Sequence, residues 1–197
     1  MRRLLNSHGY SLLELMMVVS LGVTLSAAAV PEFLIALDDT RASGAMYHIS
    51  GRLQRARMAA VTRSAMVGMK FTHSAAGYSY AVYVDGNRNG VLSRDIQSGI
   101  DRLIVSAERL PDQFPGIEFG AIPGLPPVDP GGTAPGTDPI RLGSADMASF
   151  SAVGTSSSGT VYIRSRRDAQ YAVRIFGETG KTRMLKYDAR TRLWKQL

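Results

Sequence analysis

The hydrophobic pattern at the start of the chain predicts a membrane-spanning helix. An almost uninterrupted apolar stretch runs from Tyr10 to Leu37, and no residue from Leu15 to Val30 is charged. A helix of about 20 residues is about 30 Å long, close to the hydrocarbon thickness of a bilayer. Arg2 and Arg3 precede the stretch and favour a cytoplasmic location for that end.

After Pro31 the pattern changes to that of an amphipathic helix. Apolar residues recur at a spacing near 3.6, which is typical of one face of a helix. The residues on or near this stripe are Leu34, Ile35, Met46, Ile49, Leu53, Ala56 and Ala60. Five arginines lie between and around them: Arg41, Arg52, Arg55, Arg57 and Arg63. We predict one helix over 10–64, with its apolar stripe on a sheet and its arginines in solvent.

From Met66 the period changes to two, which predicts strands. Two alternating runs flank Ser74–Gly77 and indicate a hairpin, and further strands are expected at 103–106, near 150, and at 160–163, 171–176, 183–187 and 193–197. Pro and Gly are dense between Pro111 and Pro139, so we expect a long, mobile surface loop without regular elements there. The predicted fold class is α+β: a long N-terminal helix, transmembrane and then amphipathic, packed on a mainly antiparallel sheet in 65–197.

Glu14 separates three interpretations of the N-terminal segment. A cleaved secretory signal fits Arg2 and Arg3 and offers small residues for cleavage at Ser26–Ala29. A plain membrane anchor fits the length of the apolar stretch. Neither explains Glu14, because a carboxylate within lipid costs several kcal/mol unless it is paired or protonated. An interpretation that gives Glu14 a partner is therefore preferred.

The residues Gly9-Tyr10-Ser11-Leu12-Leu13-Glu14 resemble the type IV prepilin processing motif. The resemblance implies that a prepilin peptidase removes residues 1–9 by cutting after Gly9 and methylates Tyr10, where the family more often has Phe. Glu14 is then the fifth mature residue, and its carboxylate neutralises the amino terminus of a neighbouring subunit inside a bundle of helices. Pro31 resembles the helix-kinking proline of the same family.

The overall layout resembles the GspH/FimT family of minor pilins and pseudopilins. Beyond the N-terminal helix, the resemblance is carried by the arginine-rich helix, by Tyr83–Gly90 and by Gly180–Arg183. It implies a structural subunit of a type II secretion pseudopilus or a type IV pilus, involved in filament assembly and protein secretion. Such a subunit is held in the inner membrane by a single pass, has a periplasmic C-terminal domain and assembles with other pilin subunits.

Charge adds a second functional hypothesis. The net charge is +7, and the excess of Lys and Arg is concentrated between Thr160 and Leu197. A basic face is typical of phosphate-backbone binding, and the candidate residues are Arg164, Arg174, Lys181 and Arg183. Gly180-Lys181-Thr182-Arg183 resembles a Gly-Arg-x-Arg motif of DNA-binding FimT-like pilins, which implies DNA uptake in natural transformation as the alternative function. Protection of exposed strands from aggregation is another explanation of these charges.

The remaining chemistry is limited. Asp85, Asn87, Asn89 and Asp95 have the spacing with which a calcium-binding loop begins, but the twelfth position is Ile96, where such a loop needs Glu. A turn rich in Asn and Gly is the alternative. Calcium is the one candidate cofactor. The chain has no Cys, which removes disulfides and thiolate metal sites. No catalytic motif accompanies the histidines, so we expect a protein that is not an enzyme.

Overall fold

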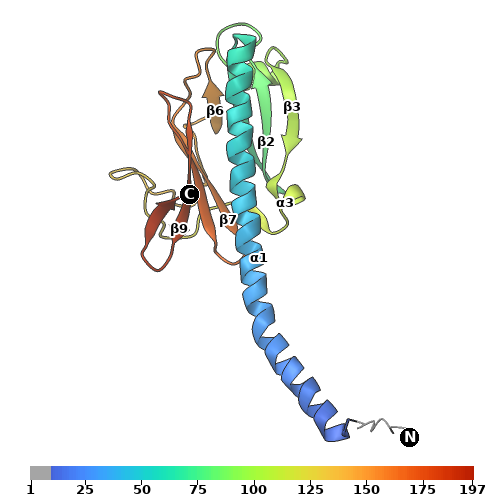
Figure 1. Cartoon of the computed structure of the whole chain (residues 1–197). Helices are drawn as coiled ribbons and strands as arrows, with labels where there is room; N and C mark the ends of the chain where they lie inside the picture. Colours follow the sequence, from blue (N-terminus) through green and yellow to red (C-terminus); the bar gives the residue numbers. More distant parts are fainter. Residues whose placement is uncertain (1–9) are drawn as a thin grey trace, which may run out of the picture. The chain divides into compact units, whose positions relative to one another are not determined.

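The computed structural model describes residues 10–197, and its first element is one long helix, α1 (Leu12–Arg63) (Figure 1). The helix begins at Leu12 because the hydroxyl of Ser11 accepts the backbone N–H of Glu14 at 3.2 Å, as an N-cap does. It ends at Arg63, and Ser64 follows with a left-handed φ of 49°. The predicted helix over 10–64 agrees with these bounds within two residues.

The chain forms two compact units, which meet between Leu37 and Asp38 within α1. The first contains the apolar part of the helix. The second contains the rest of α1 together with all the strands. The α+β fold class is confirmed.

The second unit contains two antiparallel sheets. The first has the strand order β3-β2-β1-β6, with β1 (Val67–Ser74), β2 (Gly77–Val84), β3 (Arg102–Glu108) and β6 (Met147–Phe150). The second has the order β10-β9-β8-β7-β4, and β5 also pairs with β7. Its strands are β4 (Ile117–Phe119), β5 (Ile140–Arg141), β7 (Gly159–Ser165), β8 (Gln170–Ile175), β9 (Thr182–Asp188) and β10 (Leu193–Gln196). The predicted hairpin is confirmed as β1 and β2, which pair from Val67↔Val84 to Ser74↔Gly77.

The hydrophobic core joins α1 to both sheets. The buried stripe of the helix consists of Ala42, Ala45, Met46, Ile49, Leu53, Ala56 and Ala60. It packs with inward side chains of the first sheet, such as Phe71, and of the second sheet, such as Ile163. The prediction was wrong for Leu34 and Ile35, which are 40% and 49% exposed in the first unit.

Two arginines of α1 also differ from the prediction. Arg52 and Arg57 are half-buried instead of fully solvated. Arg52 pairs with Glu108 on β3, and the Nε of Arg57 donates to the carbonyl of Gly154 at 2.9 Å. Long side chains at the edge of a packed stripe can reach neighbouring strands in this way.

The region between Pro111 and Pro139 is not free of regular structure. It contains most of α3 (Leu110–Gln113) and all of β4, in which the buried Ile117 and Phe119 flank the exposed Glu118. That alternation lets a three-residue strand extend the second sheet beside β7. A further short helix, α2 (Ser93–Gln97), and the two-residue β5 were also not predicted, because such short elements have too few residues for a period.

Candidate functional site

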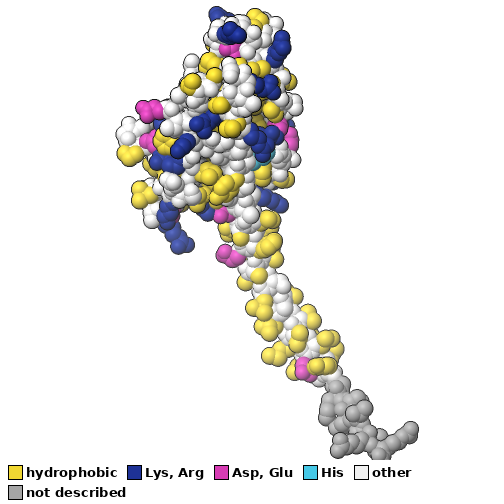
Figure 2. Space-filling view, turned by 45° about the horizontal axis from the view of Figure 1, so that its top comes forward, with side chains coloured by type: hydrophobic (Ala, Val, Ile, Leu, Met, Phe, Trp, Pro, Cys, Tyr) yellow, Lys and Arg dark blue, Asp and Glu magenta, His cyan; other side chains and the backbone are white. Residues whose placement is uncertain are grey.

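The N-terminal part of α1 exposes its apolar side chains on all sides. Between Leu12 and Ile35 every large hydrophobic side chain is at least 40% exposed, and yellow side chains surround this part of the helix in Figure 2. Among residues 10–197, α1 is the one helix long and apolar enough to cross a membrane. A helix that is apolar all round requires an apolar environment, which a bilayer or a bundle of similar helices provides.

Glu14 lies in the first turn of α1. With Ser11 it forms the Ser-x-x-Glu pattern of a capping box, of which the hydrogen bond from Glu14 N–H to the Ser11 hydroxyl is present. A carboxylate there is also favoured by the partial positive charge of the helix end. This capping pattern is visible in the sequence, and it gives Glu14 a local role in addition to the intersubunit pairing that the resemblance implies.

The other predicted processing residues are placed as follows. Tyr10 precedes the helix and is 86% exposed, whereas Gly9 and the rest of the leader lie outside the described residues. Pro31 is inside α1, which continues on both sides of it. Its ring leaves one carbonyl of the preceding turn without its usual donor. The kink stays a prediction.

Three of the four predicted DNA-binding residues share the outward face of the second sheet. Arg174 on β8 lies directly opposite Arg183 on β9. Arg164 lies on β7 four residues from Thr160, which pairs with Arg174, so the alternation of strands places it on the same face. Lys181 precedes β9 and is exposed. The structure therefore brings the three arginines to one face.

Each of these arginines is paired with a carboxylate. Arg174 Nε lies 2.6 Å from Asp129 Oδ2, and Arg183 Nη2 lies 2.7 Å from Asp129 Oδ1. Arg164 Nη2 lies 2.7 Å from Oε1 of Glu118. Asp129 belongs to the Pro/Gly-rich segment, and sequence reasoning missed it because no spacing rule links a loop carboxylate to strands that follow it by more than 40 residues. Two carboxylates thus partly neutralise the three arginines of this face.

Other cations are distributed over the β-rich unit, and Figure 2 shows dark blue side chains spread over the visible face. Arg94 and Lys195 are paired with Asp95 and Asp188. Lys186 pairs with Asp39 of α1. Part of the positive charge is therefore neutralised by ion pairs within the β-rich unit.

The predicted calcium loop is held by hydrogen bonds of its own. The carboxylate of Asp85 accepts the backbone N–H groups of Asn87, Arg88 and Gly90 at 2.8 to 3.0 Å. Asp95 lies at the start of α2, and its Oδ2 accepts the Asn89 amide at 2.8 Å. These bonds agree with the alternative interpretation, a turn built by Asp and Asn side chains. Within residues 10–197 no group of three or more acidic or His side chains is arranged to hold a metal ion.

A polar cluster connects α1 to the first sheet. Tyr80 Oη donates to Glu108 Oε2 at 2.9 Å, and His48 Nε2 lies 3.0 Å from the same hydroxyl. Arg52 pairs with the other oxygen of Glu108. Sequence reasoning found no partner for His48, because Tyr80 and Glu108 lie on strands more than 30 residues away; Arg52, one turn further along α1, also donates to His48 Nε2 at 3.4 Å.

The electrostatics of this cluster follow from its burial and its charges. Burial lowers the pKa of His48, and the neighbouring Arg52 acts in the same direction. Burial opposes ionisation of Glu108, but hydrogen bonds from Tyr80 and Arg52 outweigh it, so the pKa of Glu108 is lowered. The pKa of Tyr80 is raised, chiefly by burial. A neutral His48 beside an ionised Glu108 is the arrangement that this geometry favours near neutral pH.

Comparison of the chain with protein-family models, with curated proteins and with solved structures gave no match. The functional argument therefore depends on the residues and their geometry.

Proposed function

We propose that this protein is a minor pilin or pseudopilin, a structural subunit that assembles into a type IV pilus or a type II secretion pseudopilus. The observation that carries the proposal is α1. One continuous helix has an exposed apolar part before Leu37 and a single buried stripe after it. Such a helix suits a subunit that is stored in a membrane and later buries its apolar surface among other helices.

The proposed life cycle follows from the motif around Gly9. A prepilin peptidase cuts between Gly9 and Tyr10, and the new amino terminus is methylated. The apolar helix then holds the subunit in the inner membrane, with the β-rich unit in the periplasm. On assembly, the carboxylate of Glu14 pairs with the amino terminus of a neighbouring subunit, because both charges would otherwise be unpaired among apolar helices.

Substitution of Glu14 tests this proposal. Glu14→Ala should leave membrane insertion and processing intact and lower incorporation into filaments by about tenfold or more, because an unpaired buried charge costs several kcal/mol. Incorporation is measured by immunoblotting of sheared filaments against the membrane fraction. Glu32→Ala is the matched control, since Glu32 is a carboxylate of the same helix.

A second variant separates pairing from capping. Ser11→Ala removes the hydroxyl that accepts Glu14 N–H and keeps the carboxylate. Pairing between subunits predicts near-normal incorporation for Ser11→Ala. Equal losses in Ser11→Ala and Glu14→Ala would show that Glu14 acts by capping, and normal incorporation of Glu14→Ala would contradict the proposal.

A further inference from the structure

The segment 121–133, here called the strap, lies on the outward face of the second sheet. Leu125 is 4% exposed and packs with Tyr162, Ala172 and Leu185 in a hydrophobic cluster separate from the main core. The indole N–H of Trp194 on β10 donates to the carbonyl of Pro126 at 3.0 Å. The strap therefore covers aromatic and apolar side chains that would otherwise face solvent.

The same strap places a carboxylate between two arginines. Each oxygen of Asp129 accepts from one guanidinium, Arg174 at 2.6 Å and Arg183 at 2.7 Å. Arg174 is further oriented by the carbonyl of Gly159, to which it donates at 3.0 Å, and both guanidinium groups lie within 5.7 Å of the centre of the Phe176 ring. Two oriented guanidiniums that converge on one anionic group form a site that a phosphate group also fits.

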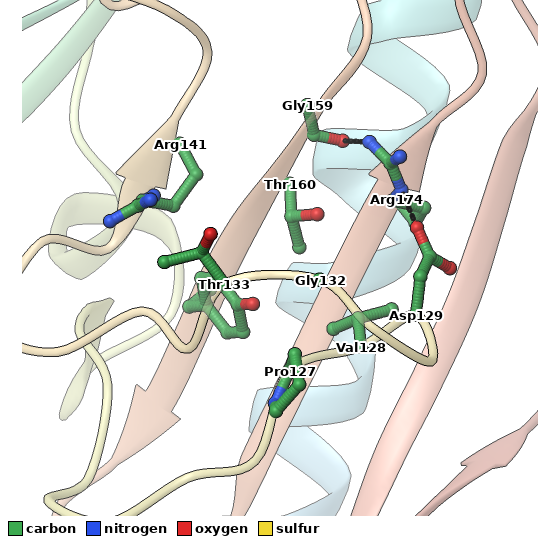
Figure 3. A pocket seen from close by; sticks show the side chains of 10 residues that line it. Pro127, Val128, Asp129, Gly132, Thr133, Arg141, Gly159, Thr160 and Arg174 are labelled. Atoms are coloured by element: carbon green, nitrogen blue, oxygen red, sulfur yellow. Dashed lines mark hydrogen bonds and ion pairs between the residues drawn. The ribbon is translucent and has the colours of Figure 1, made fainter.

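A pocket of about 200 Å³ lies beside this pair, between the strap and the sheet. Figure 3 shows Pro127, Val128 and Asp129 along the strap, with Thr160 and Arg174 on the strands behind them. Tyr162 also lines the pocket, and burial raises its pKa to about 12, so its hydroxyl stays neutral. The space under the strap thus combines a cation, hydroxyl groups and an aromatic ring.

We propose that the outward face of the second sheet is a binding surface for single-stranded nucleic acid, and that the strap occupies it with Asp129 in the place of a phosphate. Without the strap, Arg174 and Arg183 would face solvent on the same face of the sheet as the rings of Tyr162, Tyr187 and Trp194, of which Trp194 contacts both tyrosines. Cations beside stacked aromatic rings are the features that bind single strands without sequence preference. The inference takes up the nucleic-acid hypothesis and is independent of filament assembly through Glu14.

The strap is less firmly held than the core. Its one buried side chain is Leu125, whereas β7 beneath it buries six of seven residues. The partly buried Ala121, Ile122 and Val128 also pack against the cluster around Leu125. Polar contacts of the strap are the Trp194 hydrogen bond, the Asp129 pairs, and the bond from Ile122 N–H to Gln170 Oε1 at 3.0 Å. Segments with few buried apolar contacts open at a lower free energy than core strands. Opening can therefore occur while the sheets stay folded.

The test compares binding of oligo(dT) to the full-length protein and its Asp129→Asn variant in nonionic detergent. If the closed strap is favoured about tenfold, the apparent affinity of the wild type is reduced by the same factor, and Asp129→Asn should regain about tenfold. Loss of the single negative charge of Asp129 should also steepen the dependence of log K on log salt by about 0.7, the value for one phosphate of a single strand.

Two controls isolate the effect of the strap. Asp138→Asn makes the same change of charge in the same loop, where Asp138 accepts the N–H of Ile140 and forms no ion pair with an arginine of residues 10–197. It should bind oligo(dT) as the wild type does. Adding Arg174→Ala and Arg183→Ala to Asp129→Asn should abolish the gain. Equal affinities of Asp129→Asn and Asp138→Asn, or no binding by either at low salt, would overturn the proposal.

The wild-type protein provides an independent measurement. Trp194 is the chain's single tryptophan, so its indole N–H gives one resonance in a ¹⁵N spectrum. Because that N–H donates to the strap, saturation with oligo(dT) should shift the resonance and expose the proton to exchange. An unchanged indole resonance in a saturated complex would show that the nucleic acid binds elsewhere and would contradict the proposal.

Discussion

The two parts of α1 have the same helical backbone, but their apolar side chains are exposed in one part and buried in the other. In the part up to Leu37, hydrophobic side chains point outward on all sides and stay exposed. In the part from Asp38, a single stripe from Ala42 to Ala60 is buried, and most other residues are polar or charged, with Tyr47, Met58 and Val61 as exposed exceptions. The width of the apolar surface, and not the tendency to form a helix, therefore determines which environment each part needs.

Polar side chains repeat this contrast. In the first part, the hydroxyls of Ser20 and Thr24 donate to carbonyls of their own helix, each at 2.9 Å. Hydroxyls satisfied in this way remain compatible with lipid. In the second part, Ser50 bonds instead to Thr182 of β9 at 2.8 Å, and Gln54 donates to the Gly180 carbonyl. Ser20 and Thr24 are thus satisfied within the helix, whereas Ser50 and Gln54 connect the helix to β9 and the turn before it.

The largest expected effect comes from truncating equivalent leucines in the two parts. Leu53 has no exposed surface and lies in the main core. Leu53→Ala should lower the free energy of unfolding of the β-rich unit by about 2–5 kcal/mol, because it removes buried methyl groups and leaves a cavity. Leu21→Ala should leave that free energy unchanged, since Leu21 is 58% exposed. Urea unfolding followed by Trp194 fluorescence measures both variants in detergent.

A comparable loss in Leu21→Ala would contradict the division of the helix. It would mean that the apolar part before Leu37 contributes to folding of the β-rich unit. Equal stability of Leu53→Ala and wild type would contradict the packing of the buried stripe.

The helix and most strands could be predicted from the sequence because long segments carry a strong period. Met46, Ile49 and Leu53 identify the buried face of α1, and Val67, Met69 and Phe71 identify that of β1. The period extends the predicted stripe to Leu34 and Ile35. A period alone does not indicate at which residue of the helix the packing against the sheets ends. Short elements such as β4 and β5 carry too few residues for a period.

The arrangement of the candidate sites was harder to predict from the sequence. The alternation of β7, β8 and β9 places Arg164, Arg174 and Arg183 on one face. Their neutralisation by Asp129 and Glu118 depends on where the chain from 118 to 129 crosses the sheet. That path is fixed by tertiary packing, for which the local sequence offers no period, because Ile122, Leu125 and Val128 are scattered among Pro and Gly.

A smaller effect is expected at Asp39, near the start of the second part. Its carboxylate accepts from the Tyr171 hydroxyl at 2.9 Å and from Lys186 Nζ at 2.7 Å. Asp39→Ala should cost about 1 kcal/mol of unfolding free energy, a value discounted because the Asp39 side chain is 38% exposed. Tyr171→Phe in the same background tests the origin of the loss. If the bond to Tyr171 matters, the double variant loses less than the sum of the single variants.

The smallest effect concerns pH and the polar cluster that ties α1 to the first sheet. Burial lowers the pKa of His48 below 6.5, so the folded state binds fewer protons than the unfolded state, and this contribution to stability is lost as the pH falls below about 6.5. The pKa of Glu108 is also lowered, from 4.5, despite its burial, because Tyr80 and Arg52 stabilise its charge. Its contribution is lost on further acidification, below about pH 4.5. Protonation of either group therefore lowers the stability of the folded state, that of His48 below about pH 6.5 and that of Glu108 below about pH 4.5.

Two variants should separate these ranges in urea unfolding between pH 3 and 8. His48→Gln should flatten the upper part of the decline and Glu108→Gln the lower part, each by less than about 1 kcal/mol, because the cluster is partly solvated. Leu21→Ala should follow the wild-type profile, because the exposed part of α1 has no contact with this cluster among the hydrogen bonds and ion pairs of residues 10–197. If His48→Gln instead declined from pH 6.5 as the wild type does, the upper range would have an origin other than His48.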